Sequence, residues 1–194
     1  SDLRVRAAFR EMGYSRPIAK VLAELCCLRC CLPQGAPTSP ALSNIIAYPM
    51  DKKMMALAGE YGLVYTRYAD DLTFSGDYLP KDEVLVRIHR IIREEGFTMN
   101  VKKTRFLSEH KRKIITGVSV SSGKKMTLPK VKKREIRKNV HYVLTKGLVG
   151  HQEHIGSTDP VYLKRLLGSL CYWRSIEPDN RYVSDSITAL KRLM

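Results

Sequence analysis

Residues 63–75, LVYTRYADDLTFS, carry the clearest indication of fold in this chain. Its first six residues and its last four have the β-branched and aromatic composition of strands, and only Ala69, Asp70 and Asp71 lie between them. Two strands joined this closely pair with each other. We therefore predict a tight antiparallel hairpin with two acids at its tip.

The acids are the most informative part of this hairpin. Adjacent carboxylates at a turn repel each other, so stability alone does not explain them. Mg²⁺ binds hard oxygen ligands, usually one or two carboxylates together with substrate phosphates. Two such ions stabilise the attacking and the leaving oxygen of an in-line phosphoryl transfer. Asp70 and Asp71 are therefore candidate magnesium ligands, although Asp-Asp pairs are also common in surface turns.

Positive charge is concentrated in the second half of the chain. Of the net charge of +15 over 194 residues, residues 1–100 carry +1 and residues 101–194 carry +14. This asymmetry favours nucleic acid as a partner, because each neutralised phosphate releases a counterion. A solvated basic face and an anionic membrane surface are the weaker alternatives.

The composition bounds the class of protein. Hydrophobic residues make up 44%, enough for a sizeable core. No apolar run approaches the roughly 18 residues of a membrane span, and the first residues lack the apolar run of a signal peptide. We expect a soluble, non-secreted protein.

Four of the five cysteines crowd into residues 26–31, which suits a reducing cytosol better than a disulfide framework. Cys27-x-x-Cys30 and His151-x-x-His154 each resemble half of a zinc site, but a structural zinc needs four ligands together. The favoured interpretation of the cysteines is small apolar residues on a buried helix.

The periodicity of apolar residues predicts an α+β chain with a boundary near residue 128. The first part is mixed, with an antiparallel sheet, and the second is a helical bundle. Helices are expected at 2–13, 17–29, 40–61, 81–95, 130–146, 160–175 and 180–193. Beyond the hairpin, short strands are expected at 97–99, 104–108, 113–120 and 124–127.

Four motifs together carry a family resemblance. They are LPQGAPTSP at 32–40, YADDLTFS at 68–75, NVKKT at 100–104 and ITG at 115–117. In this order and spacing they resemble bacterial reverse transcriptases of the retron type, within the group II intron-like superfamily. The ITG triplet resembles the signature of the retron branch and favours it over intron maturases.

The resemblance implies a polymerase palm over residues 1–128, with an antiparallel sheet packed on helices, and a helical thumb over 129–194. It implies RNA-directed DNA synthesis on a structured RNA template in the bacterial cytoplasm, with dNTPs as substrates. The product is msDNA, and antiviral defence is the associated role. Asp70 and Asp71 would bind two Mg²⁺ ions and act in catalysis.

The resemblance also assigns residues around the nucleotide. Gln34 and Gly35, together with Tyr68 and Ala69, would line the nucleotide pocket. A proline-rich loop that caps the next helix explains Gln34 and Gly35 equally well, and Ser39-Pro40 is expected to be structural.

A lysine near the nucleotide's phosphates would stabilise the leaving pyrophosphate or donate a proton. Lys103 is placed there by the family, with Lys102 as the competing candidate. Arg67, beside the acids, would contact template or brace Asp70.

Template and primer contacts are expected in the second half. Thr116 and Gly117 would lie at a primer-gripping hairpin. The helix at 130–146 would turn Ile136, Val140, Val143 and Leu144 inward. It would present a row of basic side chains to phosphates: Lys132, Lys133, Arg134, Arg137 and Lys138. The aromatic pair in Tyr172-Trp173-Arg174 would either stack on a base or lie in the core, and the core is favoured.

Reverse transcriptases need a third carboxylate, from an Asp-rich strand upstream of the Pro-Gln-Gly motif. No such stretch precedes that motif here, so we expect the chain alone to be inactive, as a fragment or as one part of a site completed by an N-terminal segment on another chain. The alternatives are a non-catalytic nucleic-acid-binding module and a scaffold for a retron effector protein.

Overall fold

The computed structural model describes residues 1–108 and 111–193. The chain forms two compact units, Ser1–Phe106 and Leu107–Met194. Within the described ranges, no helix is both long and apolar enough to cross a membrane.

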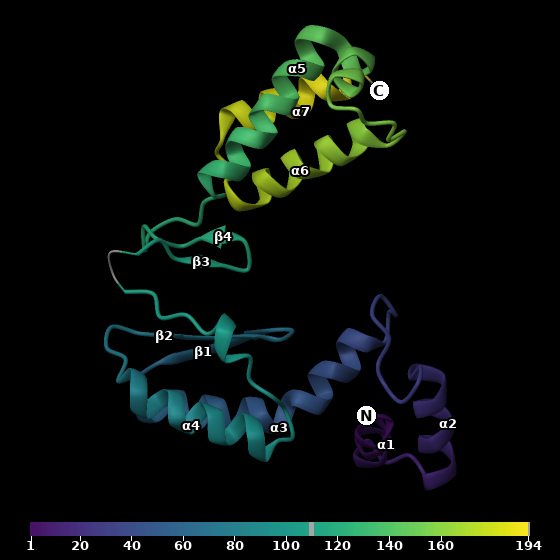
Figure 1. Cartoon of the computed structure of the whole chain (residues 1–194), viewed down its shortest axis with the longest axis vertical. Helices are drawn as coiled ribbons and strands as arrows, with labels where there is room; N and C mark the ends of the chain where they lie inside the picture. The colour runs from purple at the N-terminus through teal and green to yellow at the C-terminus, as the bar shows by residue number, and fades with distance from the viewer. Residues whose placement is uncertain (109–110, 194) are drawn as a thin grey trace. The chain divides into compact units, whose positions relative to one another are not determined.

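The first unit places a β-hairpin against two helices. Its elements are α1 (Asp2–Glu11), α2 (Arg16–Cys26), α3 (Ser39–Glu60), β1 (Val64–Tyr68), β2 (Asp71–Ser75), α4 (Lys81–Glu94) and the 3-10 helix η1 (Val101–Lys103). Figure 1 shows β1 and β2 lying along α3 and α4. Apolar side chains from the helices, including Met54 and Ile92, pack against Tyr65, Leu72 and Phe74 of the hairpin. The expected antiparallel hairpin is thus confirmed.

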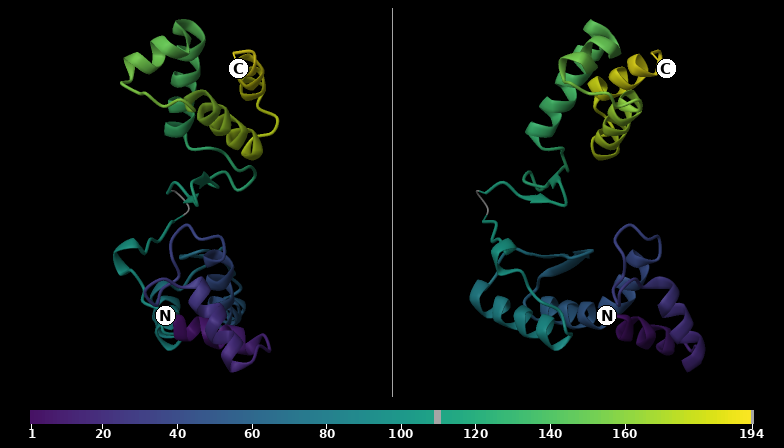
Figure 2. Two further views of the ribbon diagram at one scale, coloured as in Figure 1. Left: turned by 90° about the vertical axis from the view of Figure 1, so that its right-hand side faces the viewer. Right: turned by 45° about the vertical axis from the view of Figure 1, so that its right-hand side comes forward.

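A smaller core joins the first three helices. Val5 of α1, Ala23 of α2 and Leu42 of α3 are buried together. Figures 1 and 2 show α1 and α2 side by side near the N-terminal half of α3. The long helix α3 contains Pro49 without a break in its assignment, and its N-terminal half contributes to this core while its C-terminal half supports the hairpin.

The cysteine segment differs from expectation. Helix α2 ends at Cys26, before the expected end at residue 29, because a tight turn follows it. Leu28 and Cys31 exchange two backbone hydrogen bonds of 2.8 and 3.0 Å, and Arg29 and Cys30 between them have φ of 49° and 61°. Cys30 and Cys31 are exposed, so the interpretation as a buried helix is wrong for this segment.

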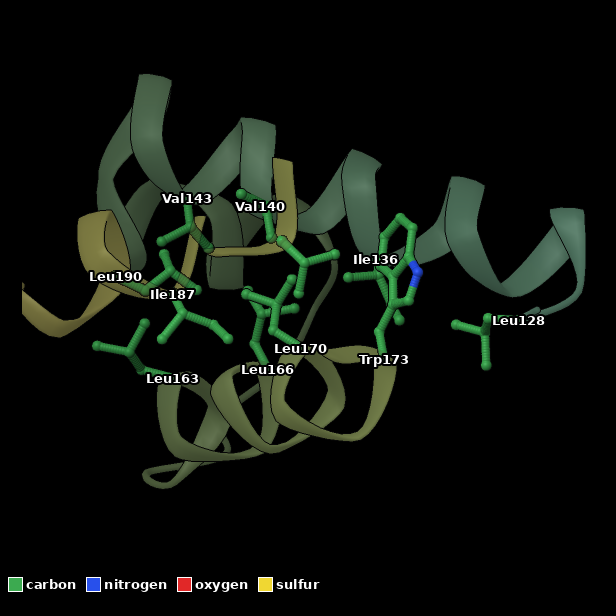
Figure 3. Packing of buried hydrophobic residues seen from close by; sticks show 11 residues of the cluster. Leu128, Ile136, Val140, Val143, Leu163, Leu166, Leu170, Trp173, Ile187 and Leu190 are labelled. Carbon is green, nitrogen blue, oxygen red and sulfur yellow. The ribbon is translucent and has the colours of Figure 1, made fainter. Parts of the chain in front are cut away.

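The second unit is a helical bundle preceded by a small hairpin. Its elements are β3 (Ile114–Ile115), β4 (Val118–Ser119), α5 (Lys130–His154), α6 (Tyr162–Ile176) and α7 (Arg181–Lys191). Figure 3 shows its core, in which Ile136 and Val140 of α5 face Leu166, Leu170 and the fully buried Trp173 of α6. Helix α5 is interrupted at Gly147 (φ 74°, ψ 165°), which agrees with an expected end at residue 146.

The strand predictions in the connecting region are mostly wrong. No strand forms at 97–99 or 104–108, and the stretch at 113–120 is split by a turn into two strands of two residues. The stretch at 124–127 contributes only an isolated bridge between Ser119 and Thr127. Repeated turns in this region leave too few consecutive residues for longer ladders.

The two units divide at residues 106 and 107, earlier than the boundary expected near 128. Leu128 is buried in the core of the second unit, and its backbone N–H donates to the Glu177 carboxylate at 2.9 Å. These contacts attach the segment around β3 and β4 to the helices. The assignment of palm and thumb roles to the two parts remains a prediction.

The helix starts in this unit also need correction. Helix α6 begins at Tyr162, two residues after the expected start at 160, and Asp159 accepts a hydrogen bond from the Val161 N–H at 3.1 Å. Asn180 does cap α7, because its side chain accepts from the N–H of Val183. Leu144, expected inside the bundle, is 46% exposed.

Candidate active site and basic surface

The hairpin turn is tighter than its sequence predicts. Tyr68 pairs directly with Asp71, so only Ala69 and Asp70 form the turn, and Asp71 is the first residue of β2. Ala69 has φ 52°, in the left-handed region. This conformation costs an L-residue about 1–2 kcal/mol, and such strain tends to collect at functional sites.

Arg67 holds this turn in place. Its guanidinium donates to both carboxylate oxygens of Asp51, with Nε–Oδ1 2.8 Å and Nη2–Oδ2 2.6 Å. Its Nη1 also donates to Asn44 Oδ1 at 2.9 Å and to the carbonyl oxygen of Ala69 at 3.1 Å. Arg67 therefore ties the turn backbone to α3, and its expected contact with Asp70 is not among these bonds.

The Asp51 carboxylate accepts hydrogen bonds from Tyr65 as well as from Arg67. Tyr65 donates its hydroxyl hydrogen to Asp51 Oδ1 at 2.7 Å. The hydrogen bonds from Arg67 lower the pKa of the Asp51 carboxyl, against the effect of burial. Burial, together with the bond to Asp51, raises the pKa of the Tyr65 hydroxyl. Asp51 thus braces the hairpin as a paired anion.

Unlike Asp51, Asp70 and Asp71 have no ion-pair partner among the described residues. Both are exposed, and neither side chain forms a hydrogen bond or ion pair with any residue that the structure describes. Their carboxylate oxygens are hard donors, and no cationic side chain in the described ranges pairs with them, so this donor set fits Mg²⁺. In the described part of the chain they are not joined by a third acid, histidine or cysteine at metal-binding distance.

The Pro-Gln-Gly loop is anchored to the start of α3. Ser39 donates its hydroxyl to the carbonyl oxygen of Pro33 at 2.7 Å. Gln34 and Gly35 are exposed, and Gly35 has φ 84°, which favours glycine. The same half of α3 carries Asn44, the partner of Arg67, and the closed end of the hairpin lies on this side of α3 (Figure 1). Loop and turn are therefore fixed to one helix.

The candidate lysines lie in η1. Lys102 and Lys103 are both exposed and form no ion pair with the described residues, so the structure does not choose between them. Tyr68, which precedes the turn, is 72% exposed and available to a ligand.

In the second unit, Thr116 and Gly117 form the complete turn between β3 and β4. Their φ values are 46° and 85°, so both central residues are left-handed, as in a type I′ hairpin turn. Threonine is strained there because its side chain is branched at Cβ. The turn is exposed, as contact with a primer would require.

The basic row on α5 is shorter than expected. Lys132, Arg134 and Lys138 are exposed. Arg137 is also exposed, but its guanidinium carbon lies 5.3 Å from the ring centroid of Trp173 and 5.2 Å from that of Tyr182. It covers the edge of the core as well as carrying charge.

Lys133 does not join this exposed row. Its side chain is 20% exposed, and its Nζ lies 2.6 Å from Glu177 Oε1. Burial alone would raise the pKa of the Glu177 carboxyl, but hydrogen bonds from Lys133, the Leu128 N–H and Asn180 lower it to about 2. Lys133 is therefore a structural cation, a role that local sequence does not reveal.

Trp173 and His151, two other candidate residues of the second unit, are buried. Trp173 lies in the core, as favoured, while Tyr172 is 49% exposed. His151 is buried, its Nε2 is 2.8 Å from the Tyr162 hydroxyl, and burial lowers its pKa. The described residues hold no cluster of three metal ligands around the histidines or the cysteines.

Sequence reasoning missed Asn44, Asp51 and Tyr65, which hold the hairpin. An acid in the middle of the long helix α3 is a weak signal by itself. Its meaning depends on Arg67, sixteen residues later, folding back onto it.

Comparisons with known proteins show the family of this chain. Residues 14–143 match the family described as reverse transcriptase (RNA-dependent DNA polymerase). Retron Ec86 reverse transcriptase of Escherichia coli is 38% identical over 154 residues, covering 78% of this chain and 47% of the relative. Retron Mx65 reverse transcriptase of Myxococcus xanthus is 34% identical over 196 residues, covering 91% and 43%.

Retron Ec73 reverse transcriptase of Escherichia coli is 27% identical over 173 residues, covering 85% of this chain and 52% of the relative. The chain thus spans about half the length of the curated relatives it matches. The family match includes the Pro-Gln-Gly loop, the acidic hairpin and the first turns of α5. The chain belongs to the reverse transcriptase (RNA-dependent DNA polymerase) family, in its bacterial retron-type branch.

Proposed function

We propose that this chain carries the catalytic hairpin of a retron-type RNA-directed DNA polymerase, which copies a structured RNA template into DNA. The observation that carries the proposal is the exposed pair Asp70 and Asp71 on a strained turn braced by Arg67. A turn that serves only to reverse the chain has no need for two acids unpaired among the described residues and a partly buried ion pair behind them. Membership of the reverse transcriptase family supports this interpretation.

In this proposal the two acids hold magnesium. Bound Mg²⁺ supplies the positive charge that neutralises the triphosphate and stabilises the attacking and leaving oxygens. Asp70 and Asp71 contribute oxygen ligands at a fixed place, because the Arg67–Asp51 pair keeps the turn from moving. A further carboxylate is expected from protein outside this chain, in the full-length enzyme or on a partner.

The nucleotide is proposed to lie between the Pro-Gln-Gly loop and the turn. The amide of Gln34 can both donate to and accept from a sugar or base edge, and Gly35 allows close approach of the backbone. Lys103, or its neighbour Lys102, would place a cation near the leaving pyrophosphate. Thr116 and Gly117 would contact the primer backbone.

The proposal is tested by primer extension with Mg²⁺ and dNTPs. The chain is assayed alone and together with the N-terminal part of the Retron Ec86 enzyme, which we propose as a source of the further carboxylate. Extension is expected only in the second arm. There, Asp70→Asn and Asp71→Asn should each lower it by at least about 100-fold, since several kcal/mol of metal-dependent stabilisation are lost.

Asp77→Asn is the matched control, because Asp77 is another exposed acid just beyond β2 without an ion pair among the described residues. It should leave extension within about twofold. Extension that survives both Asp70→Asn and Asp71→Asn would refute the catalytic assignment. Robust extension by the chain alone would refute only the need for a further carboxylate.

A non-catalytic nucleic-acid-binding module is the second candidate, because residues 101–194 carry +14 of the net charge. It predicts tight, salt-sensitive RNA binding. It also predicts no magnesium-dependent extension in either arm of the same assay.

A further inference from the structure

Helix α3 holds the Arg67 guanidinium at two points. Asp51 accepts from its Nε and Nη2 edge at 2.8 and 2.6 Å, and Asn44 accepts from Nη1 at 2.9 Å. Asn44 and Asp51 are seven residues apart, about two helical turns, so they lie on the same face of α3. A carboxylate on one edge of the guanidinium lets the opposite nitrogen swing about that edge. Asn44 is the second fixed point, and it stops this swing.

The nitrogen that Asn44 holds is the one that reaches the turn. Nη1 carries two hydrogens, and it donates to Asn44 Oδ1 and, at 3.1 Å, to the carbonyl oxygen of Ala69. Arginine only donates, so the Asn44 atom that faces it must be the amide oxygen. Asn44 thus determines where Nη1 lies, and Nη1 holds the Ala69 carbonyl.

The Ala69 carbonyl in turn determines the position of Asp70. A peptide unit is planar, so the carbonyl oxygen of Ala69 lies in one plane with the backbone nitrogen and Cα of Asp70. The turn consists of these two residues alone, and Ala69 has φ 52°. A strained conformation persists only where its surroundings hold it. Holding this oxygen therefore holds the backbone that carries the Asp70 carboxylate.

The two partners of Arg67 differ in what they contribute. The Arg67 and Asp51 side chains are only 10% and 18% exposed, so their ion pair is part of the packed structure. Asn44 is exposed and makes no other side-chain hydrogen bond with the described residues, so water can replace it with little loss of stability. Water does not replace its fixed position. The bond from Asn44 therefore serves the geometry of the turn more than folding.

We propose that Asn44 is a positioning residue: through Arg67 it holds the Ala69–Asp70 peptide, and with it the Asp70 carboxylate, where magnesium binds. The inference deepens the proposed function and rests on it in taking Asp70 as a magnesium ligand. A misplacement of about 1 Å near a reacting centre can lower a rate by about 100-fold, so a loosened ligand has a measurable effect.

The first test measures the order of the turn in the full chain without metal. Backbone order parameters from ¹⁵N relaxation should be near the rigid value of about 0.85 for Ala69, Asp70 and Asp71. Asn44→Ala should lower the value at Asp70 by at least about 0.1, towards that of flexible backbone. An unchanged value in this variant would overturn the proposal.

Two variants separate the bond from a general disturbance of α3. Ser43→Ala is the matched control, because Ser43 is the exposed neighbour and its hydroxyl makes no hydrogen bond with the described residues. It should keep the turn rigid, and so should Asn44→Asp, which retains an accepting oxygen. Alanine favours a helix, so Asn44→Ala should keep the urea midpoint within about 0.3 M. Equal loosening in Ser43→Ala, or in Asn44→Asp, would refute the role of the amide oxygen.

The second test is the two-part primer-extension assay at varied Mg²⁺. Asn44→Ala should raise the Mg²⁺ concentration for half-maximal extension by about 3–10-fold and leave the KM for dNTP within about twofold. A loosened turn with an unchanged Mg²⁺ requirement would refute the positioning role. Absence of extension with the unmodified chain would refute the proposed function instead, and the relaxation data alone would then decide whether Asn44 holds the turn.

Discussion

At the scale of single residues, Arg67 shows how a functional turn can be made rigid. Removing its side chain leaves Asp51, 18% exposed, without its charge partner. A partly buried carboxylate that loses such bonds destabilises the fold, so Arg67→Ala should lower the free energy of unfolding by about 1–3 kcal/mol. Urea unfolding followed by circular dichroism measures this loss.

Arg90→Ala is the control for Arg67→Ala, because Arg90 is 66% exposed and only 3.9 Å from its partner Glu94. Its effect should stay within about 0.5 kcal/mol. Replacing Arg67 and Asp51 together should cost less than the sum of the single changes, since no unpaired charge then remains. Additive losses would show that the two side chains do not act as a pair.

Glu177 gives a pH-dependent prediction for the second unit. Its pKa in the folded protein is about 2, below the unfolded value of about 4.3. The stabilisation is therefore fully present above about pH 4.5 and is lost as the pH falls towards 2. The shift corresponds to at most about 3 kcal/mol.

Trp173 is the single tryptophan and lies in the core of the second unit, so its fluorescence reports the unfolding of that unit. Glu177→Gln should lower stability at pH 6 and flatten its dependence on pH between about 4.5 and 2. Glu135→Gln, a change at a 56% exposed carboxylate, should leave the dependence as it is. An unchanged acid slope in Glu177→Gln would contradict the assignment.

At the scale of elements, Gly147 separates two helical segments within α5. Its φ of 74° and ψ of 165° lie in a region that is essentially restricted to glycine. Gly147→Ala should therefore destabilise the second unit by about 1–3 kcal/mol, measured by Trp173 fluorescence in urea. Gly168→Ala in α6 should instead stabilise by about 0.5–1 kcal/mol, because an added Cβ meets no atom there.

Elements whose contacts are local could be predicted from the sequence. The β1–β2 hairpin was predictable because its strands and turn are adjacent, and helix α4 because its apolar residues repeat at helical spacing. Lys133 was misplaced because its orientation depends on Glu177, which directly follows the end of α6. Helix α2 ended early because hydrogen bonds between Leu28 and Cys31 form a turn that helical periodicity does not signal.

The candidate site was predictable for a different reason. Asp70 and Asp71 stand out because their charges are unfavourable without a cation, which is a local property. The supporting bonds of Asn44, Asp51 and Tyr65 join residues that are distant in sequence, so only the fold brings them together.

At the scale of the whole molecule, each hydrophobic cluster lies within one unit. The cluster around Trp173 contains residues from 128 onward, and the clusters around Val5, Met54 and Leu63 contain residues before 107. We therefore expect two unfolding transitions. Far-UV circular dichroism should report both, and Trp173 fluorescence should report only that of the second unit.

Two core substitutions test this independence. Leu170 and Met54 are both fully buried, so replacing either by alanine should cost about 2–5 kcal/mol. Leu170→Ala should shift the fluorescence midpoint, whereas Met54→Ala should leave it in place and shift only the other part of the circular dichroism curve. If Met54→Ala moved the fluorescence midpoint as far as Leu170→Ala does, the two units would unfold as one cooperative body. Loss of the hairpin's support around Met54 would then also loosen the helices packed around Trp173, and the two units would share one stability.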